Sequence, residues 1–327
     1  MRAQVGLGVV ALLGACACAG AERDAPAGTG GGAGAAGLAG PERYLTPSAY
    51  DCRASDAVEP PPRPHPPSCH RDVSCSSPVI VAHRMATPFA PENSLSALRA
   101  AILLGVDAVE TDVRLSADGQ VVLIHDATVE RTFQGSGAVS ELTLAELAQL
   151  PMKVNPDLGG EFGCDRVPTL DEVFAIAKGR IIVELEVKDT AAGVESARYL
   201  RDNGLYDHAF LLCSPSECAA ARAEVPDVPI MSRPSSLEAI DAELAYDPPP
   251  ILVHTDATDA YTAPAVVAKI HGVGAKLFQN AFTNADADAI FTQSLASYPK
   301  RFEAGVDVLQ TEYPHFALTA LGRLTPK

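Results

Sequence analysis

Residues 79–84 read Val-Ile-Val-Ala-His-Arg, a β-branched apolar run that ends in two polar side chains. The same transition recurs at residues 108–112, Ala-Val-Glu-Thr-Asp, and at residues 181–188, Ile-Ile-Val-Glu-Leu-Glu-Val-Lys. Short apolar runs of this kind predict strands that are buried on both faces of a parallel sheet. Parallel sheets and barrels carry their active sites at the carboxyl ends of the strands. The three runs therefore predict a parallel β structure and a candidate site where each run becomes polar.

Further apolar runs alternate with Ala-rich and Leu-rich stretches through residues 79–327, which predicts β/α units joined in parallel. The candidate strands are residues 79–83, 108–113, 181–188, 209–214, 229–232, 251–255, 275–281 and 307–312. Eight parallel strands in a segment of about 250 residues match the α/β class and, within it, a (β/α)8 TIM barrel.

A ninth apolar run, residues 121–126, follows the segment Ser-Ala-Asp-Gly at residues 116–119. Asp-Gly is a strong signal for a hairpin turn, whereas a parallel crossover needs about a dozen residues or more. We therefore expect this run to pair antiparallel, outside the eight barrel strands. It belongs to a small inserted subdomain that follows the second strand and spans residues 114–180.

The first residues of the chain predict export. Arg2 precedes an apolar stretch, residues 5–13, which is too short to cross a bilayer and is typical of a secretory signal peptide. Residues 13–16, Leu-Gly-Ala-Cys, resemble the lipobox of bacterial lipoproteins, so residues 1–19 are interpreted as a lipoprotein-type signal with Cys16 as the lipid anchor. The alternative is an ordinary signal peptide in which Cys16 is incidental. The lipoprotein interpretation predicts a protein on the periplasmic or cell-surface face of a bacterial membrane.

Residues 20–78 predict a tether followed by an extension. Up to residue 40 the sequence is almost entirely Gly, Ala and Pro, which buries little apolar surface. The extension is rich in Pro, and we expect its histidines, His65 and His70, to be solvated. Eight cysteines in an exported chain suggest disulfides. Besides Cys16 and Cys18 the cysteines are Cys52, Cys69, Cys75, Cys164, Cys213 and Cys218, whose pairing the sequence does not determine.

The composition restricts the partners of the protein. The chain has 47% hydrophobic and 20% charged residues, which is enough apolar material for a sizeable core. Its formal net charge of −16, without a long basic run, argues against nucleic acid as a partner. An acidic protein that handles phosphate must neutralise it locally, with a divalent cation or with Arg and Lys side chains.

Glu110 and Asp112 lie two residues apart on one predicted strand, so their side chains share a face. Glu186 and Lys188 share a face in the same way on the next barrel strand. Crowded carboxylates repel one another unless a cation lies among them, and oxygen ligands suit a hard cation such as Ca2+ or Mg2+. An isolated Glu-x-Asp would more often be a solvated strand face. The apolar flanks and the third carboxylate favour a metal site.

Two histidines accompany this acidic group. His83 and His125 each end an apolar run, and each precedes a charged residue. A lone His at such a place is more often a packed, hydrogen-bonded residue than a catalyst. A pair beside a metal site fits a general acid and a general base that cleave a P–O bond near neutral pH. Arg84, which can grip two oxygens at once, and Lys188 can offset the charge of a bound phosphate.

These residues belong to motifs that occur in a fixed order. The motifs are His83-Arg84, Pro91-Glu92-Asn93, Glu110-Thr111-Asp112-Val113, Asp118-Gly119, His125-Asp126, Arg131-Thr132, Val167-Pro168-Thr169-Leu170, Glu186-Val187-Lys188, Gly305-Val306-Asp307 and Gln310-Thr311-Glu312-Tyr313-Pro314. No single motif is specific, but the ordered set, from residue 79 to about residue 316, resembles the glycerophosphodiester phosphodiesterase family.

The resemblance implies a TIM barrel with a small inserted subdomain, a bound divalent cation, and hydrolysis of glycerophosphodiesters to glycerol 3-phosphate and an alcohol. By motif it implies His83 and His125 as the acid/base pair, Glu110, Asp112 and Glu186 as metal ligands, and Arg84 and Lys188 as phosphate contacts. Glu184 lies on the same face as Glu186 and is a candidate to support the ligands. Two alternatives stay open: a phospholipase D-type lyase that releases a cyclic phosphate from lysophospholipids, and a lipoprotein that binds phosphodiesters or Ca2+ without turnover.

The sequence departs from the family at three places. Met85 replaces the Gly that usually follows His-Arg, which predicts an added side chain at the rim of the site. The closing Thr-Asp is Thr311-Glu312. The late aromatic motif, which usually contains Trp, is represented by Phe278-Gln279-Asn280 in a chain that has no Trp. We therefore expect the phosphate chemistry to be retained and the alcohol and glycerol pockets to differ.

Overall fold

The computed structural model describes residues 37–327. The predicted signal segment, its anchor Cys16 and most of the predicted tether lie outside the described residues, so these features stay predictions. Within residues 37–327, no helix is both long enough and apolar enough to cross a membrane.

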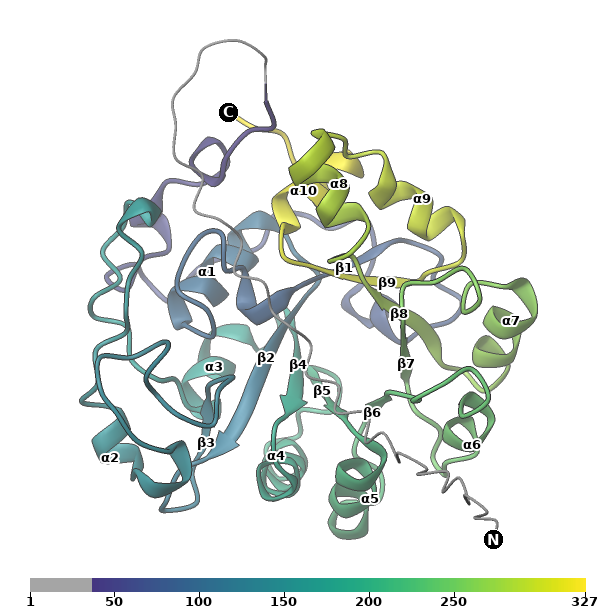
Figure 1. Ribbon diagram of the computed structural model, residues 1–327, viewed down its shortest axis with the longest axis horizontal. Coiled ribbons are helices and arrows are strands. Elements are labelled where there is room, and N and C mark those ends of the chain that lie inside the picture. The colour runs from purple at the N-terminus through teal and green to yellow at the C-terminus, as the bar shows by residue number, and fades with distance from the viewer. Residues whose placement is uncertain (1–36) are drawn as a thin grey trace, which may run out of the picture. The chain divides into compact units, whose positions relative to one another are not determined.

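A closed β-barrel forms the centre of the described chain (Figure 1). Its strands are β1 (Val79–Ala82), β2 (Ala108–Leu115), β4 (Ile182–Val187), β5 (Ala209–Cys213), β6 (Ile230–Ser232), β7 (Leu252–Thr255), β8 (Lys276–Asn280) and β9 (Val308–Thr311). Neighbouring strands pair in parallel, and β1 closes the ring because it pairs with both β2 and β9. The predicted TIM barrel is confirmed, and every predicted barrel strand agrees with an observed strand to within two residues.

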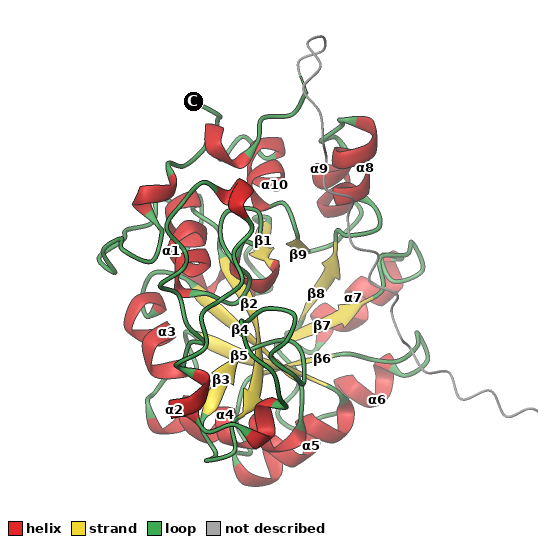
Figure 2. Ribbon diagram, turned by 60° about the vertical axis from the view of Figure 1, so that its left-hand side comes forward, coloured by secondary structure: helices red, strands yellow, loops and turns green. Residues whose placement is uncertain are grey.

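Helices surround the barrel and connect successive strands (Figure 2). They are α1 (Leu95–Leu104), α3 (Leu170–Ala177), α4 (Thr190–Asp202), α5 (Pro215–Glu224), α6 (Ile240–Leu244), α7 (Pro264–Gly272), α8 (Ala285–Thr292), α9 (Ser297–Glu303) and α10 (Pro314–Ala320). Several begin at a side chain that accepts a hydrogen bond from the first turn, as Ser94 does for α1 and Thr169 for α3. Such caps fix the residue at which each helix starts.

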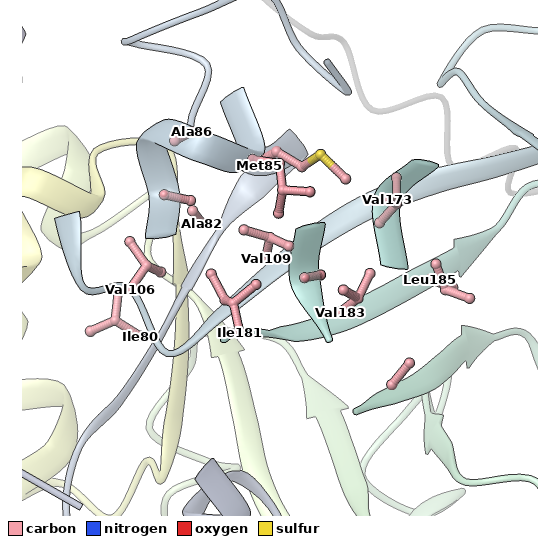
Figure 3. Packing of buried hydrophobic residues seen from close by; sticks show 14 of the residues in the cluster. Ile80, Ala82, Met85, Ala86, Val106, Val109, Val173, Ile181, Val183 and Leu185 are labelled. Carbon is pink, nitrogen blue, oxygen red and sulfur yellow. The ribbon is translucent and has the colours of Figure 1, made fainter. Parts of the chain in front are cut away.

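Side chains alternate between two cores along each barrel strand. On β4, Val183 and Leu185 face the surrounding helices and belong to one large apolar cluster (Figure 3). Ile182 faces the other way and packs in the barrel interior. Glu186 lies four residues after Ile182 and therefore points to the interior as well. The same alternation on β2 turns Glu110 inward, so the strand period itself brings the carboxylates together.

Strand β3 (Val121–Leu123) pairs antiparallel with β2, as the Asp-Gly turn predicts. It opens the inserted subdomain, which also contains α2 (Leu144–Leu147) and has a small core of its own. This core consists of Val122, Ile124, Val129, Phe133, Val139, Leu147, Met152 and Val167. Helix α3 comes next in the chain and packs against α1 in the ring of helices.

The extension, residues 37–78, packs against the barrel and forms one compact unit with it. Tyr44 and Tyr50 are buried in the large core cluster. A disulfide joins Cys52 to Cys164 in the inserted subdomain. The extension is therefore tied to the body both by apolar packing and by a covalent bond.

The two histidines of the extension are buried, so the expectation that they are solvated is wrong. Nε2 of His65 lies 3.4 Å from Oδ1 of Asp107. The His70 ring stacks on Phe210, and its Nδ1–H donates to the Pro67 carbonyl oxygen at 2.7 Å. Burial lowers the pKa of His70 to about 4. The Pro-rich sequence around these residues has no periodic pattern that would have indicated this packing.

A second disulfide loop, Cys69–Cys75, closes the amino-terminal end of the barrel. Cys69 is fully buried in the interior cluster. The buried Lys276 ammonium, at the start of β8, donates to the carbonyl oxygens of Cys69 and Cys75, each at 2.7 Å. A buried charge requires such partners. This end of the barrel is thus filled by the chain itself.

We expect these two disulfides to contribute unequally to stability. Cys52–Cys164 joins residues 112 apart, whereas Cys69–Cys75 joins residues 6 apart. Loop-closure entropy corresponds to about 4–5 kcal/mol for the long loop and about 2 kcal/mol for the short one. Replacing both cysteines of the first pair by Ala should therefore lower the midpoint of thermal unfolding more than the same change in the second pair. Equal or reversed effects would contradict this entropic origin.

Candidate active site

The first polar residues follow β1 in a strained turn. Arg84, Met85 and Ala86 have positive φ angles of 45°, 70° and 96°. Such angles cost a non-glycine residue about 1 kcal/mol or more. The turn aims the backbone N–H of Arg84 at Oε2 of Glu110, 2.8 Å away, and Nε2 of His83 lies 3.7 Å from the same oxygen. The strain therefore accompanies a close approach of the chain to a carboxylate.

Met85 does not place a side chain at the rim, so that expectation is wrong. Its side chain is fully buried in the helix-facing core, in the same cluster as Val109 (Figure 3). The φ angle of 70° explains why Gly suits this position. The replacement therefore acts on the backbone and the core rather than on the space open to a substrate.

Three carboxylates meet at the carboxyl ends of β2 and β4. The strand register places Asp112 opposite Glu186, and one oxygen from each of Glu110, Asp112 and Glu186 lies within 4.8 Å of the other two. Glu110 and Asp112 are fully buried. Burial and the nearby charges of Asp112 and Glu186 raise the pKa of Glu110 well above its usual range. Such crowding is unfavourable without a cation.

These residues fit a divalent cation. Oε1 of Glu110 is buried and has no hydrogen-bond partner among residues 37–327. A buried oxygen without a partner, beside two further carboxylates, is the arrangement that a hard cation completes. The structure thus brings together the three residues that the sequence predicts as metal ligands, and ligation itself stays a prediction.

Asn93 holds Asp112 in place, a role that the sequence did not reveal. Its Nδ2 donates to Oδ2 of Asp112 at 2.8 Å, and its Oδ1 accepts from the Thr111 hydroxyl at 2.7 Å. Burial opposes ionisation of Asp112, but Lys188, His125 and the Asn93 hydrogen bond together hold its pKa below the usual range. The motif Pro-Glu-Asn marks this residue in the sequence, but the sequence does not show that Asn93 contacts Asp112.

Two cationic side chains lie beside the carboxylates. Nζ of Lys188 is 2.9 Å from Oδ1 of Asp112 and 3.0 Å from Oε1 of Glu186. Nη1 of Arg84 is 3.3 Å from Oε2 of Glu92, and its Nε is 3.9 Å from Oδ2 of Asp112. Both predicted phosphate contacts therefore lie beside the carboxylates, and their contact with a phosphate stays a prediction.

His83 is oriented by Glu312. The His83 Nδ1–H donates to Oε1 of Glu312 at 2.7 Å, which leaves Nε2 on the side of Glu110. Glu312 is fixed in turn, because its backbone N–H donates to Oδ2 of Asp286 at 2.9 Å. The His83 ring also lies 4.8 Å from the ring of Phe282. In the sequence Glu312 is visible only as a departure from Thr-Asp, so its contact with His83 was missed.

His125 follows β3 in the inserted subdomain. Its Nδ1–H donates to Oδ1 of Asp126 at 2.7 Å. Arg131 donates to both oxygens of Asp126, at 2.7 and 3.0 Å, and to both oxygens of Glu92, at 2.7 and 2.8 Å. The Arg131 hydrogen bonds keep the pKa of Asp126 below its usual range. Because Glu92 also pairs with Arg84, charged contacts link the inserted subdomain to the turn after β1.

Residues 83–203 match the Glycerophosphoryl diester phosphodiesterase family. This segment contains both histidines and all three carboxylates of the site. This segment is similar to the glycerophosphodiester phosphodiesterase family. The resemblance inferred from the ordered motifs is thereby confirmed.

Curated glycerophosphodiester phosphodiesterases match over part of their length. The glycerophosphodiester phosphodiesterase of Caldanaerobacter subterraneus subsp. tengcongensis is 40% identical over 111 residues, which are 34% of this chain and 45% of the relative. Glycerophosphodiester phosphodiesterase 1 of Mus musculus is 36% identical over 138 residues, which are 41% of each chain. The chain thus spans less than half the length of these relatives.

Solved glycerophosphodiester phosphodiesterases share the fold. The structure from Agrobacterium tumefaciens str. C58 covers 74% of this chain and 100% of its own, with a TM-score of 0.63 at 24% identity. A phosphodiesterase of Oleispira antarctica, in complex with the product sn-glycerol-3-phosphate, covers 75% and 97% with a TM-score of 0.60 at 27% identity. Both likenesses cover about three quarters of this chain, more than the segment that the family match covers.

Proposed function

We propose that this protein hydrolyses glycerophosphodiesters to glycerol 3-phosphate and an alcohol, with a divalent cation, Ca2+ or Mg2+, as its cofactor. One observation carries the proposal: two histidines, each with a carboxylate on Nδ1, accompany a cluster of three carboxylates, two of which are fully buried. The product bound to the Oleispira antarctica relative supports the substrate class.

Different charged residues would contribute to phosphate binding in different ways. Glu110, Asp112 and Glu186 would hold the cation, which when bound polarises the phosphoryl oxygens. Arg84 presents a planar guanidinium that can bind two oxygens, and Lys188 supplies a compact charge. Together these groups offset the negative charge of the diester in a protein whose net charge is −16.

The two histidines would move the protons. Each donates its Nδ1–H to a carboxylate, Glu312 for His83 and Asp126 for His125. Nε2 of each ring is then the atom that exchanges a proton with the substrate. One Nε2 accepts the proton of the attacking water, and the other donates a proton to the departing alkoxide.

We further propose that the protein is exported and held on a membrane by a lipid on Cys16. Three disulfides within residues 37–327 support an oxidising compartment, where such bonds persist. Cys16→Ala should abolish incorporation of labelled palmitate and release the protein from the membrane fraction. An unchanged membrane fraction would leave the ordinary signal peptide as the better interpretation.

The activity can be tested directly. Purified protein should release glycerol 3-phosphate from glycerophosphocholine, as measured with glycerol-3-phosphate dehydrogenase. Phosphorus NMR of the products separates hydrolysis from the lyase alternative, because a lyase acting on lysophosphatidylcholine yields a cyclic phosphate. Binding of diesters without any product would favour a pure binding protein.

Glu312→Gln is expected to lower kcat by about 10-fold to 100-fold with little change in KM. Gln can still accept the Nδ1–H of His83, but it has no charge to stabilise the imidazolium that forms during proton transfer. The exposed Glu303→Gln provides a control that removes one carboxylate elsewhere. An unchanged kcat in Glu312→Gln would show that the contact is structural only.

A further inference from the structure

A cavity of about 150 Å3 adjoins the metal-ligand candidate Glu186 at the carboxyl ends of β4, β5 and β6. Leu212 and Cys213 form the apolar part of the cavity wall. The position of Cys213 is fixed by its disulfide to Cys218 in the first turn of α5. The polar lining includes Arg233 and Glu217. The mechanism proposed above assigns no role to either residue.

Arg233 supplies the positive side of this cavity. Its side chain is 55% exposed, and its Nη1 lies 3.9 Å from Oε1 of Glu186. Among residues 37–327 it makes this one long ion pair and no hydrogen bond. A guanidinium has five N–H donors in a planar fork that matches a carboxylate. Arg233 therefore has the capacity to bind an anionic group that enters the cavity.

Glu217 supplies the negative side. Its Oε2 accepts from the backbone N–H and the hydroxyl of Ser214, at 2.9 and 2.7 Å, in a capping box at the start of α5. These two hydrogen bonds hold the carboxylate at the amino-terminal end of the helix. The cavity thus presents a fixed negative charge on one element and an available positive charge on another.

We propose that this cavity selects a small zwitterionic head group of the amino-acid type, with its carboxylate on Arg233 and its ammonium beside Glu217. The inference rests on the proposed phosphodiesterase function, because the cavity adjoins Glu186 and would receive one substituent of a phosphate bound there. A choline group lacks the carboxylate, and a glycerol group lacks both charges. Glycerophosphoserine has both.

Three substrates isolate the two charges. The kcat/KM of the wild-type protein should be highest for glycerophosphoserine. It should be lower for glycerophosphoethanolamine, which differs by the carboxylate alone, and lowest for glycerophosphoglycerol, which lacks both charges. Arg233→Gln should lower kcat/KM for glycerophosphoserine by about 10-fold to 100-fold, and change the other two by about twofold at most. Glu217→Gln, which keeps a capping side chain, should lower kcat/KM for both amine-bearing substrates and spare glycerophosphoglycerol.

Arg198→Gln removes the same charge from the surface of α4, where Arg198 pairs with Glu195 and Glu224, and should leave all three rates unchanged. The proposal is overturned if Arg233→Gln lowers all three rates equally, since Arg233 would then act on the phosphate or on Glu186. It is also overturned if the wild type does not prefer glycerophosphoserine. Absence of turnover of every diester by the wild type would instead contradict the phosphodiesterase function.

Discussion

Replacing His83 or His125 by Ala is expected to lower kcat/KM for glycerophosphodiester hydrolysis by about 100-fold to 10,000-fold. Nε2 of His83 lies 3.7 Å from Oε2 of Glu110, and the Nδ1 atoms of His83 and His125 are held by Glu312 and Asp126. Neither histidine lies in an apolar core, so folding should be retained. The loss of kcat/KM in the double variant should not exceed the product of the losses in the two single variants, because the two groups act in one reaction.

His208→Ala is a suitable control for this experiment, since His208 lies on the loop before β5, outside the site. Thermal unfolding of each variant, followed by circular dichroism, separates loss of chemistry from loss of fold. Near wild-type kcat/KM in either His83→Ala or His125→Ala would remove that residue from the proton transfers.

Removal of the divalent cation should abolish activity, and addition of Ca2+ or Mg2+ should restore it. Without the cation, Glu110 and its two neighbours are left crowded, with burial already raising the pKa of Glu110. Lys188, within 3.0 Å of both Asp112 and Glu186, offsets part of this charge. We therefore expect the chelated protein to remain folded but inactive.

Asp112→Asn tests the same site without a chelator. The amide keeps the shape of the side chain but loses the charge that favours a cation. The cation concentration that gives half-maximal activity should rise by about 10-fold or more. Asp171→Asn, at the exposed start of α3, is the matched control. Full activity in the presence of EDTA, with no cation detected by elemental analysis, would contradict the role of the carboxylates.

The barrel was predictable because two local signals agree. Apolar runs mark the buried strands, and the change from Val or Ile to charged residues marks their carboxyl ends. Glu110 and Asp112 share a face through the strand period alone, so their proximity follows from the sequence. Glu186 lies opposite Asp112 because β2 pairs with β4. The sequence predicts this pairing, since β2 and β4 are successive strands of the barrel.

Contacts between distant segments were not predictable in this way. Glu312 lies 229 residues from His83, and their hydrogen bond exists because β1 pairs with β9 to close the barrel. Met85 is buried because the turn after β1 has positive φ angles, which no local pattern encodes for a non-glycine residue. The packing of His70 on Phe210 depends on a Pro-rich segment whose path the sequence does not specify.

Hydrolysis by His83 and His125 is tested most directly by phosphorus NMR of glycerophosphocholine incubated with the protein and a divalent cation in 18O-enriched water. We expect the wild type to form glycerol 3-phosphate that carries one 18O atom on phosphorus, and the His83→Ala, His125→Ala double variant to form none. A cyclic phosphate product, or equal turnover by the double variant, would contradict hydrolysis by this pair of histidines.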